Sequence, residues 1–372
     1  MHKKIIFLAV AIMLLPLAAG YCQVEEPEIV WEQYVGHPLD RAQFSPDGSI
    51  IAYRNPDNGQ FDIRDAETGE IIIDDKTFNG GKVRDFTFFP DSRRIAITTG
   101  VNGPVVYIYD YEIGIIDSVR KYYGNPFDSS GVATFVEVSP DGKYLVFGIA
   151  IGWTTPEYFI NKLFFFFFQS KEMIDSLPSR DIEFSKDGRY MAAFHREYNP
   201  KLKLYSVPDW KLYKTFPQTN YEDIAISPDG SMIATAGGSG YVRIWDIESG
   251  EMIFKERHSG GASTVLFSNN YKYILGFGGN FPNDFSLKFW NIKSKEIVKI
   301  YQDYRGSWTI SPHNGYLLFD SDPNLYLIKE DWDFNPVISK EIDKQTTLYP
   351  NPTNNKVQIE FNLSSFSNVN IN

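Results

Sequence analysis

A short turn sequence recurs seven times along this chain of 372 residues, and it limits the fold more than any other feature. The full form is Ser-Pro-Asp-Gly between two apolar stretches, as in Ser45–Gly48, Ser139–Gly142 and Ser227–Gly230. The second position of the seven copies falls at residues 46, 90, 140, 186, 228, 269 and 312, which gives spacings of 44, 50, 46, 42, 41 and 43 residues. A repeat of this length is typical of a four-stranded propeller blade of about 40–45 residues.

The residues of the turn indicate what each copy does. Proline fixes φ for the first corner, aspartate accepts hydrogen bonds from the nearby backbone, and glycine tolerates φ > 0. Each copy is therefore expected to join the first two strands of a blade as a β-hairpin. Seven units fill the chain from about residue 30 to about residue 340, which leaves no room for a second globular domain. We predict an all-β, seven-bladed β-propeller of four-stranded antiparallel blades over residues 28–340.

Two strand patterns extend this prediction. The apolar run Leu163–Phe168 contains five consecutive phenylalanines and is expected to be an inner or third strand of the third blade, buried on both faces. A membrane-inserting loop is the alternative interpretation of this run. The segment Pro27–Tyr34 precedes the first full blade and is expected to form the outer strand of the last one. Such pairing closes the ring and removes an exposed sheet edge.

Several blade ends resemble the WD-repeat family. Trp245-Asp246 is a literal Trp-Asp pair at the end of a third strand, Trp290-Asn291 is a near match, and Gly36-His37 matches the Gly-His pair of the family. The resemblance implies a propeller fold. Most blades lack the histidine and the tryptophan, so the side-chain hydrogen-bond network of the family is expected to be incomplete here.

The first twenty residues have the pattern of a signal peptide. Lys3 and Lys4 supply the positive charge, Ile5–Leu17 is the apolar segment, and Ala18–Gly20 offers small residues for cleavage. An uncleaved anchor is the alternative, although the apolar segment is short for a membrane span. Tyr21 precedes Cys22 where a lipid-attachment motif requires a small residue, so lipidation is not expected.

The last residues have a pattern that differs from the recurring unit of the propeller. The segment Leu348, Tyr349, Pro350, Asn351 and Pro352 is followed by the alternating apolar residues Val357, Ile359 and Phe361, which predict a strand. It resembles the opening of the C-terminal sorting domain of the type IX secretion system of Bacteroidetes-like bacteria. The resemblance implies export across the outer membrane and makes residues 346–372 a partial sorting domain that interacts with the type IX machinery. The tail is either degenerate or part of a longer chain.

Composition excludes some classes of partner. The formal net charge of −11 repels phosphate backbones, so nucleic acid is not an expected partner. Cys22 is the only cysteine and cannot form an internal disulfide or a thiolate metal cage. We expect a secreted or cell-surface monomer, without cofactor, without bound metal, and without a transmembrane segment after signal cleavage.

The sequence contains no convincing catalytic constellation. His37, His195, His258 and His313 are scattered, with no spacing suited to a metal site. The recurring turn aspartates Asp47, Asp141, Asp187 and Asp229 are expected to be structural.

Binding residues are instead expected on one face of the ring. That face should carry the loops between second and third strands and the links between blades, and its Tyr, Trp and Arg residues are common interface anchors. The candidates are Tyr122, Tyr123, Trp153, Arg196, Tyr198, Tyr221, His258, Phe281, Tyr304 and Arg305. The expected function is a non-enzymatic platform that binds a protein, peptide or glycan. The alternative is a hydrolase or lyase with its site in the central channel.

Overall fold

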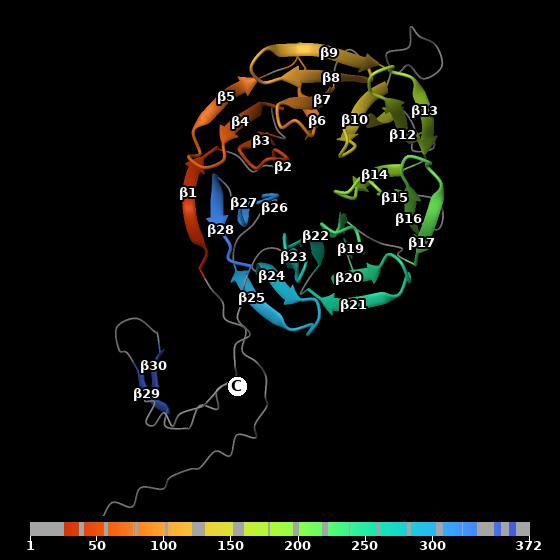
Figure 1. The fold of residues 1–372 in the computed structure, drawn as a ribbon. Coiled ribbons are helices and arrows are strands. Elements are labelled where there is room, and N and C mark those ends of the chain that lie inside the picture. The colour runs from red at the N-terminus through yellow and green to blue at the C-terminus, as the bar shows by residue number, and fades with distance from the viewer. Residues whose placement is uncertain are drawn as a thin grey trace, which may run out of the picture. The chain divides into compact units, whose positions relative to one another are not determined.

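A computed structural model shows seven four-stranded antiparallel sheets arranged as a ring, together with a separate two-stranded hairpin. The predicted fold class is confirmed (Figure 1). The structure describes residues 26–36, 41–55, 59–76, 78, 81–100, 103–120, 131–151, 160–177, 179–195, 201–217, 222–237, 239–258, 261–280, 284–302, 308–321, 323–332, 346–350 and 357–361.

Six blades are continuous in sequence, and each runs in chain order from an inner strand to an outer strand (Figure 1). Blades 1 to 3 consist of β2 (Arg41–Phe44), β3 (Ile50–Arg54), β4 (Phe61–Asp65) and β5 (Ile71–Lys76); β6 (Val83–Phe88), β7 (Arg94–Thr99), β8 (Val105–Asp110) and β9 (Gly114–Arg120); and β10 (Gly131–Val138), β11 (Tyr144–Ile151), β12 (Ile160–Phe167) and β13 (Met173–Leu177). Blades 4 to 6 consist of β14 (Ser179–Phe184), β15 (Tyr190–His195), β16 (Lys201–Ser206) and β17 (Leu212–Phe216); β18 (Asp223–Ile226), β19 (Met232–Ala236), β20 (Tyr241–Asp246) and β21 (Met252–Arg257); and β22 (Ala262–Phe267), β23 (Tyr273–Asn280), β24 (Asp284–Asn291) and β25 (Ile297–Gln302).

Blade 7 is composite and closes the ring. Its three inner strands are β26 (Trp308–Ile310), β27 (Tyr316–Ser321) and β28 (Asn324–Lys329), and its outer strand is β1 (Glu28–Tyr34). The register runs from Glu28 opposite Lys329 to Tyr34 opposite Asn324. The predicted closure by the N-terminal segment is therefore confirmed.

The recurring turn joins the first and second strands of each blade, as predicted. In blade 5 the Ser227 N–H donates to the Met232 carbonyl over 2.9 Å, and the other blades repeat this bond. Gly230 has φ of 70°. Where glycine is replaced, Ser92 and Tyr271 still adopt φ of 60° and 47°. The fold imposes this turn even on residues that pay a steric penalty of about 1–2 kcal/mol in the left-handed region.

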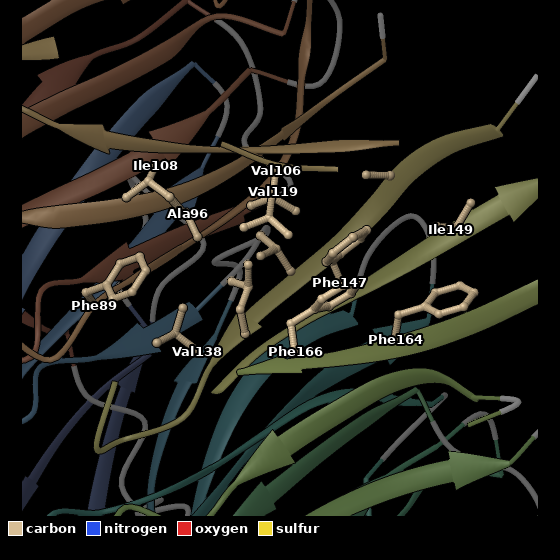
Figure 2. Packing of buried hydrophobic residues seen from close by; sticks show 13 residues of the cluster. Phe89, Ala96, Val106, Ile108, Val119, Val138, Phe147, Ile149, Phe164 and Phe166 are labelled. Atoms are coloured by element: carbon tan, nitrogen blue, oxygen red, sulfur yellow. The ribbon is translucent and has the colours of Figure 1, made fainter. Parts of the chain in front are cut away.

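The hydrophobic core is divided among the seams between blades. Seven apolar clusters are found among the described residues, and each one joins a different pair of neighbouring blades. Figure 2 shows the cluster between blades 2 and 3, where the Phe147 and Phe166 rings stack with centroids 5.1 Å apart. Stability therefore depends on contacts between blades, since a single four-stranded blade leaves both of its faces uncovered.

The phenylalanine run lies in β12, the third strand of blade 3, as expected, but its burial is incomplete: Phe167 is 41% exposed, and Phe168 lies beyond the end of the strand. Phe164 and Phe166 pack toward blade 2, whereas Leu163 and Phe165 pack toward blade 4. These four side chains are at most 3% exposed. Alternate side chains of a strand point to opposite faces, so an uninterrupted apolar run fits a strand covered on both sides.

The C-terminal hairpin belongs to a second compact unit, distinct from the unit Cys22–Phe334 that contains the propeller. It pairs β29 (Thr346–Pro350) with β30 (Val357–Phe361), with Leu348 opposite Ile359. The strand predicted from Val357, Ile359 and Phe361 is confirmed. Asn351, Pro352 and the predicted signal peptide lie outside the described residues.

Candidate functional site

The ring has two unlike faces. Because the strands of each blade are antiparallel, the turns between first and second strands share one face with the turns between third and fourth strands. We call this the turn face. The opposite side, the connection face, carries the segments between second and third strands and the links from one blade to the next. Any ligand on the ring must use one of these faces, the outer rim or the axis.

On the turn face, every first turn has the same length and nearly the same hydrogen bonds. Five residues separate the first and second strands in all seven blades, for example 227–231 between Ile226 and Met232. The Ser227 hydroxyl donates to Asp229 Oδ1 over 2.6 Å and accepts from the Met232 N–H over 2.9 Å. Burial acts to raise the pKa of Asp229, but hydrogen bonds from Ser227 and Ser231 outweigh it and hold the pKa below its usual value. The structural role predicted for the turn aspartates is confirmed.

Neighbouring turns also bond to one another around the axis. The Asp47 N–H donates to Ser92 Oγ over 3.0 Å, which links blades 1 and 2. His313 Nε2 donates to the Pro46 carbonyl over 2.9 Å, which links blades 7 and 1. Asn269 Nδ2 donates to the Ser311 carbonyl over 3.0 Å between blades 6 and 7. Many polar groups of the turn face are thus occupied within the protein itself.

Segments on the connection face vary widely in length. Between second and third strands, two residues join Ser321 to Asn324, whereas eight join Ile151 to Ile160. Between blades, one residue joins Leu177 to Ser179 and ten join Arg120 to Gly131. Nine of the predicted binding residues fall on these segments and lie outside the described residues: Tyr122, Tyr123, Trp153, Arg196, Tyr198, Tyr221, Phe281, Tyr304 and Arg305. Their role in binding stays a prediction.

His258 is the one predicted binding residue that the structure describes, and its side chain is fully buried. Its Nε2 lies 3.0 Å from the Ser286 carbonyl, to which it donates, and its ring meets Trp290 edge-on at 6.1 Å. The imidazole therefore ties the link after blade 5 to blade 6. A surface contact through this side chain, which the sequence suggested, does not fit its burial.

A charged cluster that the sequence analysis missed joins the inner strands of blades 1, 2 and 3. Arg41 Nε of β2 lies 2.9 Å from Asp85 Oδ1 of β6, and Arg41 Nη2 lies 3.9 Å from Glu137 Oε2 of β10. Asp85 also accepts the Val136 N–H over 2.8 Å. Burial raises the pKa of Asp85, and Arg41 and the Val136 N–H oppose this rise. The cluster holds three blades together at the axis.

The Asp85 bond has a counterpart across the ring. Asp223 of β18 accepts the Val265 N–H of β22 over 2.9 Å, as Asp85 accepts that of Val136. Asp85 and Asp223 both stand four residues before the first position of the recurring turn. An alignment of the repeats on that turn shows that the two aspartates occupy equivalent positions.

Two features are absent from the described residues. No group of three or more His, Cys, Asp or Glu side chains is arranged to hold a metal ion. None of the elements that they form is a helix that is long and apolar enough to cross a membrane.

Comparisons with known proteins match parts of the ring. A family model described as "Eukaryotic translation initiation factor eIF2A" matches residues 142–302. "Small ribosomal subunit protein RACK1z" of Arabidopsis thaliana is 29% identical over 76 residues, which cover 20% of this chain and 22% of the relative. "Small ribosomal subunit protein RACK1y" of Oryza sativa is 28% identical over 101 residues, 25% of this chain and 29% of the relative. "Protein hir1" of Emericella nidulans is 42% identical over 59 residues, 13% of this chain and 6% of the relative.

The match spans less than a third of the length of each of these curated relatives. The matches to these relatives thus extend over about one to two and a half blade lengths, and the match to the family model spans parts of blades 3 to 6. Repeat spacing, sheet topology and these partial matches agree on one architecture. The chain is a seven-bladed β-propeller with WD-repeat-like blades.

Proposed function

We propose that the protein is a non-enzymatic binding propeller that holds a protein or peptide partner on its connection face. One observation supports the proposal most strongly: segment lengths are uniform on the turn face and vary on the connection face. The turns between first and second strands are five residues long in every blade, whereas the segments between second and third strands range from two to eight residues. Rigid scaffolds with variable loops on one side are a common arrangement for recognition.

The candidate side chains add to this argument. Tyr, Trp and Arg bury large areas or make several hydrogen bonds, which makes them frequent anchors at protein interfaces. The RACK1 relatives are named as small ribosomal subunit proteins, so propellers with similar blades occur as parts of a larger assembly. Fold alone does not determine function, and the partner of this chain has to be found by experiment.

Site-specific photocrosslinking tests the proposal. A photoreactive amino acid is placed at Tyr122, Trp153 or Tyr304 on the connection face, and at the exposed control positions Tyr213 and Tyr271 near the turn face. We expect one adduct of defined mass from the first set and none from the controls. The same adduct from both sets, or only from the controls, would overturn the choice of face. Turnover of a peptide or glycan without an adduct would favour the enzyme alternative.

We further propose that the protein is exported, as the signal-like N-terminus and the sorting-like segment around Tyr349 and Pro350 suggest. Deletion of residues 1–20 should leave the protein in the cytoplasm, whereas deletion of residues 346–372 should stop it before the outer surface. Cell fractionation and N-terminal sequencing of the mature protein measure both effects. If either deleted form still reaches the cell surface, the export role proposed for the deleted segment is wrong.

A further inference from the structure

The side chain of Arg243 lies in the seam between blades 4 and 5. Alternate residues of β20 point to the same side, and Trp245 shows which side this is. Its ring joins the apolar cluster that contains Leu204 and Phe216 of blade 4, with the Phe216 centroid 5.9 Å away. Arg243 stands two residues earlier in the same strand, so its side chain leaves the strand toward blade 4 as well.

The guanidinium of Arg243 is incompletely bonded. Its Nη2 has one long contact, 3.4 Å to Ser239 Oγ, and its Nη1 is buried without an acceptor. Thr235 is the register partner of Arg243 on β19, and residues directly opposite each other share a face of the sheet. The Thr235 side chain is fully buried, and its hydroxyl also has no partner. Two unsatisfied hydrogen-bonding groups therefore lie next to each other.

An unpaired buried donor is costly. A buried polar group without a partner destabilises the folded state, and a charged group does so more strongly. Burial lowers the pKa of Arg243, and Tyr241 acts in the opposite direction. The chain has 47 acidic residues, yet no carboxylate of the described residues contacts this guanidinium. An anion carried by a ligand would supply the acceptor that this guanidinium lacks among the described residues.

A second cation lies beside the same aromatic ring. Lys255 Nζ is 4.6 Å from the centroid of the Tyr241 ring, and Arg243 Cζ is 4.9 Å from it. Lys255 is the register partner of Arg243 on β21 and is exposed, so it marks the side of the cluster that faces solvent. Cation–π contact with Tyr241 thus positions both positive groups against the same ring.

We propose that Arg243, Thr235 and Lys255 form an oxyanion subsite that takes the carboxylate or phosphate group of a ligand. The Nη1 of Arg243 donates to one oxygen, and Lys255 adds charge from the solvent side. The Thr235 hydroxyl is fully buried, so it donates to the same group once the side chains that cover it move aside. Arginine suits this task because its planar group presents several donors in a fixed geometry. The subsite deepens the binding function proposed above and rests on it for the identity of the natural ligand.

The first test uses inorganic anions and the full chain. Sodium phosphate and sodium acetate are titrated at constant ionic strength, with chloride as the balancing anion, while heat release and the unfolding midpoint are recorded. We expect a saturable response at one site. Arg243→Met should weaken binding by about tenfold or more, since it removes a hydrogen bond between two charged groups. Thr235→Val should weaken it less, and Lys293→Gln on the turn face should leave it unchanged.

The variants also separate a ligand site from a structural role. Without added anion, Arg243→Met should unfold at a midpoint at least as high as the original chain, because it removes an unsatisfied buried donor. Arg243→Lys keeps the charge without the planar fork and should bind phosphate weakly. A lower midpoint for Arg243→Met together with an unchanged anion response would overturn the proposal, as would the absence of any saturable response in the original chain.

Two further comparisons identify the ligand and keep the proposals apart. A response to phosphate alone indicates a phosphorylated ligand, whereas an equal response to acetate indicates an acidic side chain or a C-terminal carboxylate. If anions bind but photocrosslinking detects no partner, the proposed binding function is wrong and the oxyanion subsite is still supported. If a crosslinked partner is captured equally well by Arg243→Met, the partner does not use this subsite and the link between the two proposals is overturned.

Discussion

Blade 5 and blade 7 have the same four-stranded form but are assembled differently. Blade 5 uses one continuous stretch, β18 to β21, and its outer strand is tied to the third strand by the turn at residues 247–251. Blade 7 takes its outer strand, β1, from the opposite end of the chain. No turn joins β28 to β1, so hydrogen bonds and packing must do what the covalent connection does in blade 5.

Blade 7 has many polar contacts at its edges. The N–H groups of Val35 and Gly36 both donate to the Pro323 carbonyl over 3.0 Å. Trp31 Nε1 donates to the Ala66 carbonyl of blade 1 over 3.0 Å. On the other side, the buried Glu330 carboxylate accepts hydrogen bonds from Tyr301 and Lys299 of blade 6. The comparison shows that β1, which has no turn to β28, is held by hydrogen bonds to Pro323 within blade 7 and to blade 1, while Glu330 joins the blade to blade 6.

The largest expected effect comes from the side chain that anchors β1. Trp31 is 9% exposed and packs in the cluster between blades 7 and 1. Trp31→Ala should destabilise the protein by about 3–5 kcal/mol, as should Phe254→Ala in the outer strand of blade 5. Denaturant unfolding measures both values.

Hydrogen exchange then distinguishes the two blades. In Trp31→Ala the amides of β28 should lose protection together with β1, because nothing tethers the detached strand. In Phe254→Ala the amides of β20 should lose less, because the turn keeps β21 close. Equal loss of protection in the two variants would show that the turn contributes nothing to blade 5.

A smaller effect is expected from the buried carboxylate at the seam of blades 6 and 7. The Glu330 side chain is fully buried, and its Oε2 lies 3.1 Å from Lys299 Nζ. Glu330→Gln should cost about 3 kcal/mol, because removal of one partner leaves a largely buried ammonium without its counter-ion. Glu251→Gln, at an exposed carboxylate in blade 5, is the matched control and should change stability by less than about 0.5 kcal/mol. A similar small value for both would mean that the Glu330 contacts do not stabilise blade 7.

The smallest effect concerns acid. The pKa values of Asp47, Asp141, Asp187 and Asp229 all lie below the usual value in the folded protein, because hydrogen bonds to the carboxylates outweigh their burial. A lowered folded-state pKa gives stability that is present above the unfolded pKa of about 3.9 and is lost as pH falls through the folded value. The first turn of blade 7 has His313 and Asn314 in place of the aspartate.

Hydrogen exchange between pH 4 and pH 2 tests this difference. The Ser227 amide of blade 5 should lose protection relative to the equivalent Ser311 amide of blade 7, after correction for intrinsic exchange rates. These amides bond to the carbonyls of Met232 and Tyr316 over 2.9 and 2.8 Å. Parallel loss at both sites would mean that the aspartate does not stabilise its turn.

The sequence predicted the parts of the fold that repeat. Ser227, Asp229 and Gly230 act within one short turn, so their structural role can be recognised from a single copy of the repeat. The pairing of β1 with β28 was also predictable. A strand that precedes the first full blade can complete the last blade, which otherwise has only three strands. Apolar runs such as Leu163–Phe166 indicated burial on both faces.

Contacts between blades were harder to predict. Glu330 meets Tyr301, 29 residues away, and nothing in the local pattern of either residue marks the pair. The burial of His258 was missed because a histidine in a link between blades resembles a surface residue. Arg243 stands between apolar residues of a third strand, and the local pattern does not indicate that its guanidinium becomes partly buried. Such features depend on tertiary packing rather than on sequence periodicity.

The composite blade also sets the order in which the molecule can be completed. Strand β1 is synthesised before every other strand of the propeller, but its partner β28 ends at Lys329, near the end of the ring. Until that residue has been added, the nascent chain carries an unpaired N-terminal strand and an open arc of blades. Closure of the ring therefore joins the earliest and latest parts of the propeller, and a chain cut short before β28 retains two unpaired edges.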